Sequence, residues 1–166
     1  MSERGTALMT KASRQLDEIA AFLGTLNEAD LGKPCADASA GDTVDAAAAH
    51  RGGDTVGATA AHMADGYDHL GRLLQTAGCV PGSPTTAGHH RHHHARVPEA
   101  LPDLRARLVG GKARIALLAD LTDEQLDSVP PAVGLFSDGR RTLEQVIEAV
   151  IAHQAAHFAT LKRAVA

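Results

Sequence analysis

The chain has 166 residues, a length typical of one domain, which we take as residues 1–166. Its formal net charge is −4, and aromatic residues make up only 2% of the chain, with no tryptophan. These values argue against a basic nucleic-acid-binding surface and against aromatic platforms for single strands. No apolar stretch approaches the roughly 20 residues that cross a bilayer. The N-terminal segment also lacks the apolar core of a signal peptide. We therefore expect a cytoplasmic protein that binds neither nucleic acid nor membrane.

The first half of the chain predicts two amphipathic helices. Residues 6–26 carry apolar side chains three and four positions apart, as on one face of a helix. Residues 27–54 break this pattern with several glycines and form the first long connection. Thr55, or Asp54 before it, is a suitable N-cap for a second helix that ends near Gly78. Its expected core face consists of Val56, Ala60, Met63, Tyr67, Leu70 and Leu74.

The second half predicts two further helices after a polar connection over residues 80–96. Pro98 and Pro102 suit the first turn of a third helix that continues to about Leu118. The segment LTDEQL then resembles a capped helical turn, with Thr122 as the cap. A fourth helix begins at Arg140 or Thr142 and continues to the end of the chain. The sequence thus predicts an all-α fold, a four-helix bundle with long connections after the first and second helices. Connections of this length permit crossovers.

The fourth helix carries two histidines where apolar residues are expected. Its core stripe passes from Leu143 and Val150 to His153 and His157, while Gln154 is expected on the opposite, polar face. Histidines four residues apart project from the same face of a helix and can share a metal ion. Two ligands do not complete a site, because an open catalytic zinc site usually has three protein ligands.

The second helix offers the third ligand. His62 lies next to Met63 at the border of the apolar stripe, and His69 lies seven residues further along the same side. The two histidines therefore compete for the role. Asp65 is three residues from His62 and is a candidate for orienting that ring or for a catalytic role.

Several segments of the chain resemble parts of one known family. The pair HQAAH, in a helix introduced by GRRTLEQVIEAV, is similar to the last helix of the DinB/YfiT-like superfamily. GDTVGATAAHMADGYDHL resembles its second helix, and LTDEQLDSVPP and LNEADLGKPC resemble its inter-helix segments. The resemblance implies a bundle that binds one divalent metal, commonly zinc or nickel. By matching position, the ligands are His62, His153 and His157.

The resemblance specifies the site better than the reaction. Relatives include transferases and isomerases that use mycothiol or bacillithiol, hydrolases, and stress-induced proteins. We expect an enzyme that acts on a small-molecule substrate with a low-molecular-weight thiol as cosubstrate. The alternatives are a hydrolase that activates water at the metal, a non-catalytic metal-binding stress protein, and a bundle whose histidines bind no metal. Apolar residues on the helix surfaces are compatible with a homodimer.

Two features depart from the family pattern or lie outside it. The chain has no tryptophan before the second helix, and it contains the histidine-rich stretch GHHRHHHA, with five histidines between His89 and His94. We expect this stretch to be a solvated loop rather than a source of primary ligands, although histidine-rich tracts can bind metals. Cys35, after Pro34, is either an inert thiol or a reactive group or fourth ligand. Cys79 is a weaker candidate.

Overall fold

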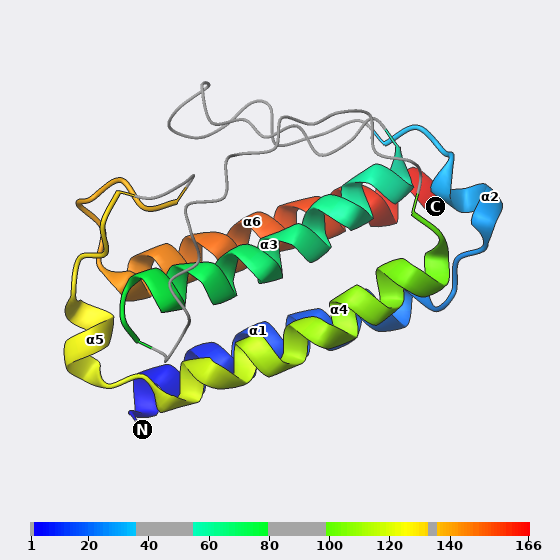
Figure 1. The fold of residues 1–166 in the computed structure, drawn as a ribbon. Coiled ribbons are helices and arrows are strands. Elements are labelled where there is room, and N and C mark those ends of the chain that lie inside the picture. The colour runs from blue at the N-terminus through cyan, green and yellow to red at the C-terminus, as the bar shows by residue number, and fades with distance from the viewer. Residues whose placement is uncertain (1, 36–54, 80–98, 133–135) are drawn as a thin grey trace.

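The computed structural model describes residues 2–35, 55–79, 99–132 and 136–166, and these residues build an all-α bundle (Figure 1). Its four long helices are α1 (Glu3–Leu23), α3 (Val56–Thr76), α4 (Leu101–Ala116) and α6 (Leu143–Val165). Three short helices connect them: α2 (Glu28–Leu31), the 3-10 helix η2 (Leu117–Asp120) and α5 (Asp123–Asp127). The described ranges contain no strand, only an isolated bridge between Pro34 and Thr55.

The bundle is not a simple up-and-down arrangement. Each long helix packs against two others, in the cyclic order α1, α4, α3, α6. Figure 1 shows that α1 and α6 run in one direction and that α3 and α4 run in the other. Because α3 and α4 are parallel, the end of α3 and the start of α4 lie at opposite ends of the bundle (Figure 1). This arrangement agrees with the expectation that the bundle need not be simple up-and-down.

Side-chain caps fix where the helices begin. Thr55 caps α3 by accepting a hydrogen bond from the backbone of Ala58, and Thr142 caps α6 in a capping box with Gln145. The predicted turn at Thr122 is α5, which has a capping box of the same kind. The first helix ends earlier than expected, at Leu23 rather than Leu26, because the Asn27 side chain caps the short helix α2.

The predicted apolar stripes form the core. Every residue expected on the inner face of α3 is buried. The apolar stripes of the other two helices are buried as well: Leu8, Ala12, Leu16, Ile19 and Leu23 on α1, and Leu101, Leu104, Leu108 and Ile115 on α4. On α6 the stripe is buried from Leu143 through Val150. Polar contacts also join α1 to α6 and to α3, since Gln15 of α1 donates to the carbonyl of Ile151 at 2.9 Å and accepts from the Tyr67 hydroxyl at 3.4 Å.

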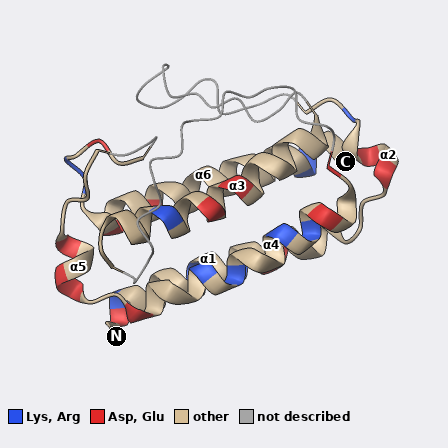
Figure 2. Ribbon diagram, in the orientation of Figure 1, with Lys and Arg blue, Asp and Glu red and all other residues tan. Residues whose placement is uncertain are grey.

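One end of the bundle is held by an arginine. The Arg4 guanidinium at the start of α1 contacts Glu144 at the start of α6, with Nη2 at 2.5 Å from Oε2, and Asp127 of α5 at 2.8 Å. Figure 2 shows the acidic residues of α5 beside the N-terminal end of α1. These hydrogen bonds to Arg4 hold the pKa of both carboxyl groups below their ordinary values. The pairs join three elements that are distant in sequence.

None of the helices within the described ranges is long and apolar enough to cross a membrane.

Candidate metal centre

Three histidines from two helices meet where α3 packs against α6. The Nε2 atom of His153 lies 3.3 Å from Nε2 of His62 and 2.9 Å from Nε2 of His157. Each of the three residues offers one ring nitrogen within 4.8 Å of the other two. Because α3 and α6 are antiparallel neighbours, His62 faces the His153–His157 pair across the helix interface. The structure therefore brings the three predicted residues together, and their role as metal ligands stays a prediction.

The cluster is enclosed on one side and reaches the surface on the other. His157 is 1% exposed, whereas His62 and His153 are half-buried. The three rings are nearly perpendicular to one another, with interplanar angles of 82–88°. Thus His157 is the buried member of the cluster, and His62 and His153 are partly exposed.

The spacing fits a shared metal ion. Nitrogens bound to a tetrahedral zinc ion at about 2.0–2.1 Å stand roughly 3.3 Å from one another. The separations of 3.3 and 2.9 Å between Nε2 atoms are close to this value. Imidazole nitrogens are ordinary ligands of zinc and nickel. In the part of the chain that the structure describes, the group that could hold a metal consists of these three residues.

Comparison with known proteins identifies the family. The family model described as the DinB superfamily matches residues 11–161, a range that contains all three histidines. The chain belongs to the DinB superfamily. Neither the curated proteins nor the solved structures gave a significant match. The DinB match and the histidine cluster together fit a metal-binding DinB-like protein.

Beside the DinB histidines lies an aromatic contact that the sequence did not reveal. The ring of Phe136, in the loop before α6, packs edge-on against His153 with 5.1 Å between ring centroids. Its apolar ring covers part of one ligand candidate and limits the directions in which the imidazole can turn. No periodic pattern marks this residue, because it lies in a loop and meets His153 only in the folded chain.

Gln154 was predicted on the polar face of the last helix, and this prediction is wrong. Its side chain is 1% exposed and donates from Nε2 to the Met63 carbonyl of α3 at 3.1 Å. The amide fits because α3 has a glycine opposite, since a Cβ on Gly66 would lie 1.8 Å from Nε2. α6 packs against both α1 and α3, so its buried arc is wider than the stripe alone indicates. Gly66, a glycine inside the predicted second helix, was the one sequence signal of a close approach by another side chain at this point.

The two remaining polar candidates on α3, Asp65 and His69, do not belong to the group that could hold a metal in the described residues. The Asp65 carboxylate forms an ion pair with Arg107 of α4, and Arg107 also pairs with Glu99 at 2.6 Å. His69 is exposed, and its Nδ1 lies 3.0 Å from Nη2 of Arg72. His62, not His69, is therefore the α3 histidine that meets α6.

Neither cysteine belongs to the histidine cluster. Cys35 is 2% exposed and packs in the hydrophobic core near the start of α3, where little solvent reaches its thiol. Burial raises the pKa of the Cys79 thiol, which disfavours the reactive thiolate. The stretch from His89 to His94 lies outside the described residues.

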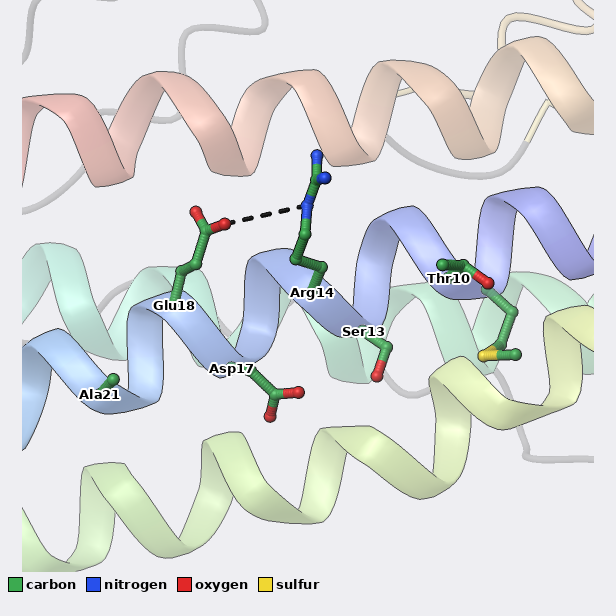
Figure 3. Close-up of a pocket in the computed structure, with 7 residues that line it drawn as sticks. Thr10, Ser13, Arg14, Asp17, Glu18 and Ala21 are labelled. Carbon is green, nitrogen blue, oxygen red and sulfur yellow. Dashed lines mark ion pairs between the residues drawn. The ribbon is translucent and has the colours of Figure 1, made fainter.

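A surface hollow lies elsewhere on the bundle. It measures about 580 Å³ and is lined by seven α1 residues between Met9 and Ala21 (Figure 3). Arg14 and Glu18 form an ion pair of 3.8 Å across it. No histidine of the cluster lines this hollow, so it offers no substrate site at the candidate metal centre.

Proposed function

We propose that this DinB protein is a mononuclear metal-dependent enzyme that activates a low-molecular-weight thiol of the mycothiol type for S-transfer or isomerisation. His62, His153 and His157 would hold one divalent ion, zinc or nickel. When bound, such an ion supplies Lewis acidity that lowers the pKa of a thiol and stabilises its thiolate.

The exposure of the cluster carries the proposal. A structural metal site is closed by four protein ligands, whereas a catalytic site keeps an open position. The described donor set has three members, and two of them are half-buried. This arrangement leaves a side of the cluster that a small molecule can approach.

The chain's own residues would bind the metal ion and orient its ligands. His153 and His157 keep a fixed spacing because they lie one turn apart on α6. Phe136 holds the His153 ring and shields one side of it from water. In the transfer, the thiolate sulfur forms a bond to an electrophilic carbon, and the leaving group departs with its electron pair. The thiol proton passes to solvent.

The choice of a thiol rests on family analogy and on composition. The family resemblance includes mycothiol- and bacillithiol-dependent enzymes. The chain is rich in alanine and arginine, as are proteins from GC-rich bacteria, and such a source is compatible with mycothiol.

The test is an assay of thiol adduct formation with mycothiol and a panel of electrophiles, using protein at full metal occupancy. We expect an adduct with the wild-type protein and with His69→Ala, the matched α3 control, but not with His153→Ala. Hydrolysis of ester or amide substrates without thiol transfer would support the hydrolase instead. Absence of any turnover by the metal-loaded protein would contradict an enzymatic role and favour the stress protein.

A further inference from the structure

A buried glutamine joins the two helices beside the histidine cluster. Gln154 follows His153 on α6, and its amide donates to the carbonyl of Met63, which follows His62 on α3. Two contacts therefore join α3 and α6 at neighbouring positions. One is between the rings of His62 and His153, and the other, one residue further along each helix, is between Met63 and Gln154. The hydrogen bond from Gln154 Nε2 to the Met63 carbonyl oxygen measures 3.1 Å, and the Nε2 atoms of His62 and His153 are 3.3 Å apart.

The packing leaves this amide little freedom. Gln154 is 1% exposed, and the missing side chain of Gly66 provides the space for its Nε2. A longitudinal shift of α6 along α3 would bring the amide against the α3 backbone and break its bond to Met63. The same shift would change the separation of His62 from the α6 histidines.

Helix stability alone does not account for a glutamine at this position. Its Oε1 is buried and has no hydrogen-bond partner within the described ranges. Burying an unpaired carbonyl is unfavourable, and an apolar side chain of similar length would avoid it. Buried polar groups at helix interfaces are known to fix register at the expense of stability.

We propose that Gln154 is a positioning residue that sets the register of α6 against α3, and thereby the spacing of His62 from His153 and His157. This inference rests on the proposed metal site. Gln154 is not one of the three candidate ligands. It acts through its hydrogen bond to the backbone of Met63, and the absence of a side chain at Gly66 leaves room for its amide.

The test compares Co²⁺ binding by the wild-type chain and by Gln154→Met, which keeps the length of the side chain but removes its amide. We expect Gln154→Met to be at least as heat-stable as the wild type. Its dissociation constant for Co²⁺ should nevertheless rise about three- to tenfold, the range expected if one hydrogen bond holds the histidines in place. The visible spectrum of the bound Co²⁺ should also change. A purely structural role does not predict a loss of affinity without a loss of stability.

Ile147→Val is the matched control, because Ile147 is fully buried on α6 but makes no polar contact with α3 through its side chain. It should lower the melting temperature and leave Co²⁺ affinity unchanged. Unchanged affinity and spectrum in Gln154→Met, or an equal loss in Ile147→Val, would overturn the positioning role while leaving the metal site intact. A wild-type chain that bound no Co²⁺ would overturn both the metal site and this inference.

Discussion

Replacing Gly66 by alanine tests the packing that brings the histidines together. The new methyl group would lie 1.8 Å from Nε2 and 3.1 Å from Cδ of Gln154. The Gln154 side chain is buried, so it cannot give way without leaving the Met63 carbonyl. We therefore expect Gly66→Ala to be destabilising, although alanine favours a helix more than glycine does.

The magnitude follows from two opposing effects. A buried donor left without its acceptor costs about 1–3 kcal/mol, and an overpacked core costs a similar amount. These two penalties overlap, because both describe the displacement of one amide. Against them, alanine gains about 1 kcal/mol over glycine inside a helix. The expected net loss is therefore at most about 2 kcal/mol, which lowers the melting temperature of a chain of this size by up to roughly 8 °C.

Thermal unfolding of single and double variants checks this result. Gly110→Ala is the matched control, since a Cβ on Gly110 meets no atom within 4 Å. It should stabilise the chain by about 0.5–1 kcal/mol. In a Gln154→Ala background, Gly66→Ala should no longer destabilise. The reasoning is refuted if Gly66→Ala raises the melting temperature as Gly110→Ala does, or if its effect is independent of Gln154.

Two further predictions concern pH. Because Arg4 holds the carboxyl pKa values of Glu144 and Asp127 below normal, these ion pairs stabilise the fold at neutral pH. This contribution declines as pH falls below the ordinary glutamate value of 4.5 and through the lowered folded values. The melting-temperature gap between wild type and Arg4→Met should thus narrow from about pH 7 to pH 3, whereas Arg14→Met, an exposed control, should show no such trend. Burial raises the pKa of Tyr67, the only tyrosine, above its ordinary 10.0, so stability should fall as pH rises above that value. Tyrosinate absorbance should appear at higher pH in the folded than in the denatured protein, and coincident titrations would contradict the burial of this ring.

Helix positions could be predicted from the sequence because burial repeats with the helical period. The stripe on α3 from Val56 to Leu74 is buried as expected, and the caps at Thr55 and Thr142 begin their helices. The end of α1 could not be placed, because the apolar pattern continues to Leu26 although the backbone turns after Leu23.

The site was predictable where its residues lie on a periodic face and not elsewhere. His153 and His157 interrupt an apolar stripe, and the family resemblance indicated His62 rather than His69. Gln154 was misplaced, since a single stripe does not show that α6 contacts two helices. Phe136 was missed because a loop residue and its partner become neighbours only through the fold.

Metal content of the untagged protein, purified without chelators, tests the metal site most directly. Elemental analysis should find one zinc or nickel ion per chain in the wild type and in His69→Ala. His153→Ala should lose stoichiometric binding, because it removes the imidazole that stands within 3.3 Å of both other rings' Nε2 atoms. A double replacement of His92 and His93 should leave the metal content unchanged. Full metal occupancy in His153→Ala would contradict the assignment of the site, and the proposed function would fall with it.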